Sequence, residues 1–124
     1  MPANILVVED DPDISKAISF ILRKLGHKVQ VAFDGPHGLE AAMQKQADLV
    51  ILDLFLPGIA GEEICKAIRE HDDEKLQKTP IIMLTAKTMD ADRIVGKVIG
   101  ANCYITKPFD MDFLLSQVQR LTAA

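Results

Sequence analysis

Residues 5–13 read ILVVEDDPD, and this stretch indicates the fold class. Four consecutive apolar residues followed by three carboxylates predict a short strand that is buried on both faces and ends at an acidic cluster. Asp11 is a suitable helix N-cap, and Pro12 is favoured at the first helical position. Gly26 is positioned to end a helix whose apolar residues recur at helical spacing. The stretch therefore predicts a strand, a turn and a helix, which together form the first unit of an α/β fold.

The same unit repeats along the chain. Short apolar or alternating runs predict strands at 5–8, 29–33, 49–52, 81–84 and 103–105. A segment of helical period follows each strand. The first helix is expected to start at residue 12, the second to run to about 46, and the third and fourth to cover 62–71 and 89–99. The last helix is expected to end near 121, and the polar stretch 72–79 is expected to be a loop. Strands that are apolar on both faces and joined by helices predict a doubly wound parallel α/β sheet with helices on both faces.

Composition limits the classes of function. The chain has 124 residues, of which 48% are hydrophobic. Residues 1–124 are therefore expected to form one globular domain, either standing alone or excised from a longer protein. The net charge of −4 without a basic run argues against direct nucleic-acid binding. No apolar stretch reaches the roughly 18 residues of a membrane span, and no secretory signal is visible. We therefore expect a cytoplasmic protein with no membrane partner.

Polar side chains follow four of the predicted strands, where ligands of such sheets bind. They are Glu9, Asp10, Asp11, Asp53, Thr85 and Lys107. Clustered carboxylates repel one another and need a cation, and oxygen ligands suit Mg²⁺. A single lysine and a hydroxyl can hold an anion that also contacts the metal, and Asp53 can attack phosphorus. These residues predict metal-assisted phosphoryl transfer onto Asp53, with Asp11 acting only as a helix cap.

Four motifs at this spacing resemble the response-regulator receiver domain of two-component signalling, which is also called the CheY-like domain. They are ILVVEDD at 5–11, DLFLPG at 53–58 with Gly61, Thr85-Ala86, and Lys107-Pro108-Phe109. The resemblance implies a flavodoxin-like five-stranded sheet of order 2-1-3-4-5. It also implies a phosphorylated signalling switch that catalyses only its own phosphorylation and dephosphorylation, and so is not an enzyme in the usual sense.

The resemblance also implies a role for each site residue. Asp53 is the phosphoacceptor, and Mg²⁺ is held by Glu9, Asp10, Asp53 and the backbone carbonyl of Phe55. Thr85 and Lys107 bind phosphoryl oxygens, and Thr85 with Tyr104 transmits the switch. Phe55 and Lys87 flank the path of the attacking water, so we expect a long-lived phosphoaspartate.

The implied partners lie on both sides of the phosphorylation step. The donor is expected to be a phosphohistidine on a sensor histidine kinase or a histidine phosphotransfer protein. The recipient is expected to be an output domain or a downstream protein that binds the face formed by 89–99, 103–105 and the last helix. The pattern is nearest to OmpR/PhoB-type receivers, although Asn102, Cys103 and Phe113 replace charged residues that are usual on their dimer face.

Other functions remain as alternatives. An aspartyl-phosphate phosphatase of the haloacid dehalogenase type would carry a second aspartate at the position of Phe55. A flavodoxin-like nucleotide or flavin binder would need a phosphate loop where Glu9, Asp10 and Asp11 stand. A pseudo-receiver would act as an interaction module without phosphorylation.

Overall fold

Five parallel strands form a single sheet in the order β2-β1-β3-β4-β5, in a computed structural model that describes residues 2–86 and 100–123. This confirms the predicted fold class and strand order. The strands are β1 (Asn4–Val8), β2 (Lys28–Ala32), β3 (Leu49–Asp53), β4 (Ile81–Ala86) and β5 (Cys103–Lys107). The central strand β3 is buried along its whole length, which explains its run of apolar residues before Asp53.

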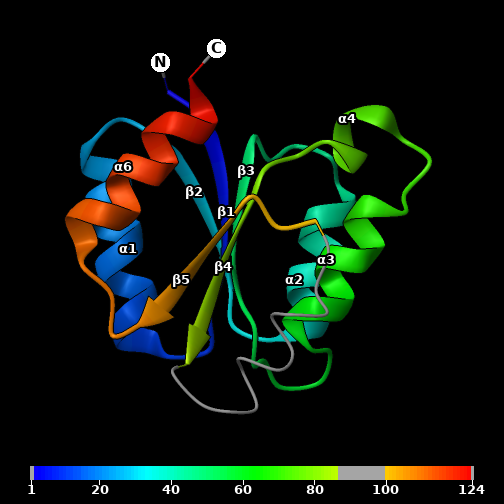
Figure 1. Cartoon of the computed structure of the whole chain (residues 1–124), viewed down its shortest axis with the longest axis horizontal. Helices are drawn as coiled ribbons and strands as arrows, with labels where there is room; N and C mark the ends of the chain where they lie inside the picture. Colours follow the sequence, from blue (N-terminus) through cyan, green and yellow to red (C-terminus); the bar gives the residue numbers. More distant parts are fainter. Residues whose placement is uncertain (1, 87–99, 124) are drawn as a thin grey trace.

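Helices cover both faces of the sheet (Figure 1). On one face lie α1 (Pro12–Lys24) and α6 (Met111–Thr122). On the other lie α2 (Gly35–Met43) and α3 (Gly61–Arg69), followed by the short α4 (Glu74–Gln77). Asp11 caps α1 by accepting hydrogen bonds from the backbone N–H groups of Asp13 and Ile14, so its predicted role as a cap is confirmed.

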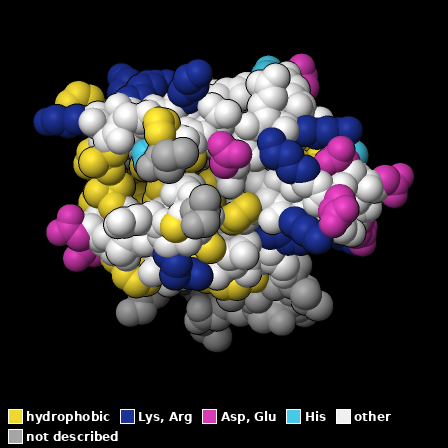
Figure 2. Space-filling model, turned by 90° about the horizontal axis from the view of Figure 1, so that it is seen from above, with side chains coloured by type: hydrophobic (Ala, Val, Ile, Leu, Met, Phe, Trp, Pro, Cys, Tyr) yellow, Lys and Arg dark blue, Asp and Glu magenta, His cyan; other side chains and the backbone are white. Residues whose placement is uncertain are grey.

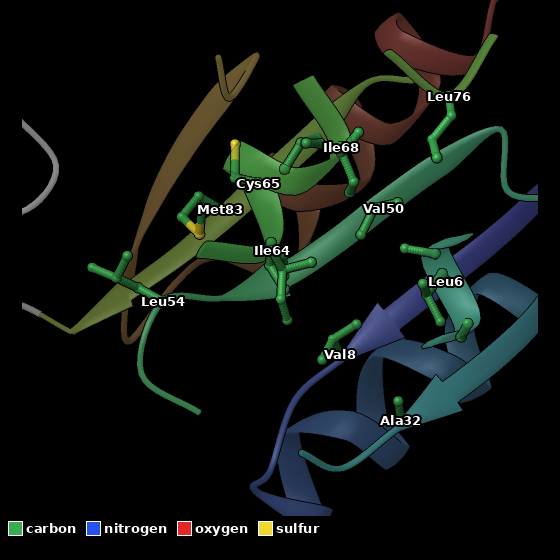
Figure 3. Close-up of a cluster of buried hydrophobic side chains, with 14 residues drawn as sticks. Leu6, Val8, Ala32, Val50, Leu54, Ile64, Cys65, Ile68, Leu76 and Met83 are labelled. Atoms are coloured by element: carbon green, nitrogen blue, oxygen red, sulfur yellow. The ribbon is translucent and has the colours of Figure 1, made fainter. Parts of the chain in front are cut away.

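Alternate residues of each strand supply two separate hydrophobic cores. Ile5, Val7 and Ile51 pack with residues of α1 and α6. Leu6 and Val50, on the opposite face, pack with residues of α2 and α3 in the cluster of Figure 3. Because β1, β3 and β4 carry buried apolar residues on both faces, they are locked between the two helix layers, and their carboxyl ends are fixed in space.

Two segments differ from the sequence prediction. The stretch expected to be a loop contains α4, which Asp73 caps through the backbone N–H of Leu76, and Leu76 is buried in the core. One apolar residue in a polar stretch gives too weak a period to predict this turn of helix. The second helix ends at Met43 rather than near residue 46, and Lys45 adopts a positive φ of 64°. The helix expected over 89–99 lies outside the described residues.

The end of the sheet where the strands begin faces away from the candidate site. Figure 2 looks onto this end, where apolar side chains gather on the side of α1 and α6. On the side of α3 and α4, lysine and arginine side chains are interspersed with aspartate and glutamate. Across the described residues, every helix is too short or too polar to cross a bilayer.

Candidate phosphoacceptor site

The carboxyl ends of β1, β3, β4 and β5 meet at one edge of the sheet. Asp53 is the last residue of β3, and Lys107 is the last residue of β5. Gly61 holds the chain close to Asp53: a Cβ at position 61 would collide with the backbone oxygen of Asp53, and the Gly61 N–H donates to Leu54 O at 2.9 Å. Only glycine permits this approach, which fixes the turn that follows the candidate nucleophile.

Lys107 bridges two carboxylates, one just after β1 and one at the end of β3. Its Nζ lies 2.6 Å from Oε1 of Glu9 and 3.1 Å from Oδ2 of Asp53. The contact with Glu9 is a close ion pair, and Nζ also donates a hydrogen bond to Asp53. Residues that are 44 positions or more apart in the sequence therefore converge on one amine, as the sequence predicted.

Burial disfavours the charged forms of the carboxylates in this cluster. The Glu9 side chain is 0% exposed, and Asp53 is 4% exposed. Burial raises the pKa of Glu9, and the neighbouring Asp53 carboxylate raises it further, against the opposing effect of Lys107. Burial by itself lowers the pKa of Lys107, but Glu9 and Asp53 outweigh burial and raise that pKa above its usual value. The amine therefore stays protonated and holds the two carboxylates together.

Backbone N–H groups orient both buried carboxylates. Oδ1 of Asp53 accepts from the N–H of Phe55 at 3.1 Å, and Oε2 of Glu9 accepts from the N–H of Asp11 at 3.2 Å. Neither contact is among the features predicted from the sequence. The first could have been predicted, because aspartate commonly accepts from the N–H two residues later in an Asx-turn.

Glu9, Asp10 and Asp53 form a group that can hold a metal ion. Each offers a carboxylate oxygen, and these atoms lie within 4.8 Å of one another. Asp10 is exposed while the other two are buried, so an ion at this site would contact both protein and solvent. Oxygen-only ligands and access for water suit Mg²⁺, which usually retains several water ligands. The donor set thus fits the predicted metal.

Of the remaining predicted site residues, the structure describes Thr85, Tyr104 and Phe55. Thr85 is 4% exposed and sits in β4 beside Thr106 of β5. Tyr104 is half-buried against the core that contains Met83, and burial raises the pKa of its phenol. Phe55 is 43% exposed. Lys87 lies outside the described residues, so its predicted place beside the water path stays a prediction.

Comparison with known proteins identifies the family. The family model "Response regulator receiver domain" matches residues 5–119. The chain belongs to the response-regulator receiver family. Receiver domains of this family are signalling switches rather than classical enzymes. The phosphatase and flavin-binder alternatives are therefore set aside.

The similar proteins include transcription regulators and a magnesium-bound receiver. The chain is 41% identical to response regulator ArlR of Staphylococcus saprophyticus over 94% of its length and 51% of the relative's. It is 44% identical to transcriptional regulatory protein DltR of Streptococcus agalactiae over 95% of its length and 51% of the relative's. Both relatives are of the OmpR type, which agrees with the predicted subgroup. This receiver chain spans about half the length of these relatives.

One similar structure bears on the metal. The receiver domain of a sensor histidine kinase from Pseudomonas aeruginosa is 32% identical, with a TM-score of 0.86 and full coverage of both chains. That crystal structure holds a magnesium ion in its active-site cleft. The family binds Mg²⁺ in its acidic pocket, and the acidic group of this chain is available for the same ion.

Proposed function

We propose that this receiver domain accepts a phosphoryl group on Asp53 from a phosphohistidine donor and thereby switches a downstream partner. The single observation that supports this most is the convergence of Glu9, Asp53 and Lys107, with Nζ of Lys107 within 3.1 Å of both carboxylates. An acceptor carboxylate beside a fixed cation is suited to in-line phosphoryl transfer.

Each residue has a defined part in the proposed step. A carboxylate oxygen of Asp53 forms the new bond to phosphorus while the bond from phosphorus to the donor's imidazole nitrogen breaks, and the nitrogen keeps the electron pair. Glu9, Asp10, Asp53 and the carbonyl of Phe55 would hold Mg²⁺, which would neutralise charge on the transferring group when bound. Lys107 remains protonated because its pKa is raised, and it moves from the carboxylates to a phosphoryl oxygen.

The switch is proposed to act through Thr85 and Tyr104. The buried Thr85 hydroxyl donates to a phosphoryl oxygen, which draws β4 toward Asp53. Tyr104, half-buried beside β4, follows and changes the surface that a partner contacts. The proposed donor is a sensor histidine kinase or a histidine phosphotransfer protein. Because its relatives are transcription regulators twice as long, the proposed recipient is an output domain or a separate regulator. We further propose that residues 1–124 act as one receiver unit.

Phosphorylation by a small donor tests the proposal. The full chain is incubated with acetyl phosphate and Mg²⁺, and its intact mass is recorded. We expect the mass of one phosphoryl group to be added, and we expect this addition to be lost with EDTA or in Asp53→Asn. Asp48→Asn is the matched control, because Asp48 binds the N–H of Asn4 at the start of β1 and should not affect the reaction. No addition to the wild type, or an addition that survives Asp53→Asn, would overturn the proposal.

A further inference from the structure

Arg69, the last residue of α3, connects three separate segments of the chain. Its guanidinium donates to Gly100 O at 2.7 Å, to Gln77 O at 2.9 Å and to Thr79 O at 2.7 Å. A fourth bond, at 2.9 Å, goes to Oδ1 of Asn102. One side chain thus joins the end of α3, the segment that leads into β4 and the segment that leads into β5.

All four acceptors are uncharged oxygens. Within residues 2–86 and 100–123, Arg69 has no ion pair with a carboxylate. Attraction between opposite charges therefore does not explain its placement. The planar, five-donor fork of arginine does, because it can serve several acceptors in fixed directions at once, whereas the compact ammonium of lysine cannot.

Asn102 and Gly100 accommodate the Arg69 side chain. Oδ1 of Asn102 also accepts from the N–H of Ile81 at 2.9 Å, and the Asn102 N–H donates to Ile81 O at 2.8 Å. Gly100 has a φ of +121°, and a Cβ there would lie 2.7 Å from Cγ of Arg69. The first residue of β4 and the residues before β5 are therefore tied to the same guanidinium.

The network fixes the beginning of an edge strand. In the order β2-β1-β3-β4-β5, strand β5 pairs with β4 alone. Its start lies at the end of the sheet seen in Figure 2, and its other end carries Lys107. A five-residue strand held on one side needs an anchor to keep its register, and Arg69 supplies one.

We propose that Arg69 is a positioning residue for the phosphoryl pocket: by fixing the start of β5 against β4, it places Lys107 beside Asp53. This inference rests on the proposed phosphorylation of Asp53. It does not extend to the metal, because Glu9, Asp10 and Asp53 follow or end β1 and β3, which Arg69 does not touch. Loss of Arg69 should therefore separate phosphoryl transfer from metal binding.

The test compares Arg69→Gln with the wild type in two measurements. Calorimetry gives the Kd for Mg²⁺, and intact mass against time gives the phosphorylation rate from acetyl phosphate at saturating Mg²⁺. We expect a Kd that is unchanged or lower, because a displaced ammonium no longer competes with the ion for Glu9 and Asp53. We expect a phosphorylation rate about tenfold lower, because small misplacements of a catalytic group carry penalties of this size or more. Adding Arg69→Gln to Lys107→Ala should lower the rate no further, since the first change acts through the second residue.

Matched variants separate positioning from general damage. Arg23→Gln is the control, because Arg23 also donates to a strand carbonyl, Val29 O, but on the other side of the sheet, and it should keep the wild-type rate. Asn102→Ala removes one acceptor and should reproduce part of the effect, while Asn102→Asp keeps the acceptor and should restore the rate. If Arg69→Gln does not fold, Asn102→Ala and its double variant with Lys107→Ala carry the test.

The outcomes are distinct from those of the proposed function. A wild type that is not phosphorylated refutes the proposed function itself. A phosphorylated wild type with an equally fast, folded Arg69→Gln refutes the positioning role. Proportional losses of Mg²⁺ affinity and rate, or a rate loss that adds fully to that of Lys107→Ala, also refute it.

Discussion

Replacing Lys107 by methionine removes the amine that bridges Glu9 and Asp53. Two carboxylates that are 0% and 4% exposed would then lie together without a cation. Breaking a buried ion pair by removing one partner costs about 3–5 kcal/mol. Because the Lys107 side chain is itself 21% exposed, we expect a smaller cost of about 2–3 kcal/mol, at or below the lower end of that range. For a domain of this size, the loss corresponds to a Tm about 10 °C lower.

The pH dependence has a defined sign. The raised pKa of Lys107 means that its ammonium stabilises the fold below the usual lysine pKa, and that this contribution is lost as the pH rises through the folded value. The raised pKa of Glu9 means that its protonated carboxyl contributes to the stability of the fold at low pH. This contribution is lost as the pH rises through the folded pKa of Glu9. Because a Glu9 carboxyl with a raised pKa takes up a proton more readily at low pH, the cost of Lys107→Met should be smaller at pH 5 than at pH 8.

Urea unfolding in EDTA and in saturating Mg²⁺ measures this cost. We expect Mg²⁺ to reduce it, because the ion neutralises the same carboxylates. Lys78→Met is the control, since Lys78 pairs with Glu74 on the surface with both side chains mostly exposed, and it should stay close to the wild type. A Lys107→Met protein as stable as the wild type in EDTA at pH 8, or one whose cost grows with Mg²⁺, would refute the electrostatic reasoning.

Three further expectations concern single groups of the site. Asp53→Asn removes one of three clustered carboxylates, so its Tm in EDTA should exceed that of the wild type; a lower Tm would contradict mutual repulsion. Phe55→Asn combined with Lys87→Glu should speed the loss of phosphate in Mg²⁺, because both new side chains can orient a water; an unchanged or slower decay removes that argument. Tyr104 is the single tyrosine, and burial raises its pKa, so ultraviolet absorbance should give a titration midpoint above that of free tyrosine.

The fold could be predicted because its signals are local and agree with one another. The apolar runs of β1, β3 and β4 are buried on both faces, and the cap at Asp11 stands where the sequence indicates. The turn of helix at Glu74–Gln77 could not be predicted, since it depends on the tertiary burial of Leu76. Local pattern carries no information about a contact that only the folded chain makes.

The site, like the fold, could be predicted only in part from the sequence. Glu9, Asp53 and Lys107 could be brought together in prediction because parallel strands end at one edge of the sheet. The sequence could not indicate that Lys107 would lie nearer to Glu9 than to Asp53. Nor could it reveal the four hydrogen bonds of Arg69, because their acceptors are mostly backbone carbonyls, which every residue carries.

The central claim is that Asp53, among three neighbouring carboxylates, takes the phosphoryl group. Borohydride reduction of the phosphorylated chain converts a phosphoaspartate to homoserine, and peptide mass mapping then locates the converted residue. The account predicts conversion at position 53 alone, in an amount that matches the phosphorylated fraction of the intact protein. Conversion at Asp10 in place of Asp53, or a phosphorylated fraction without any conversion at position 53, would contradict it.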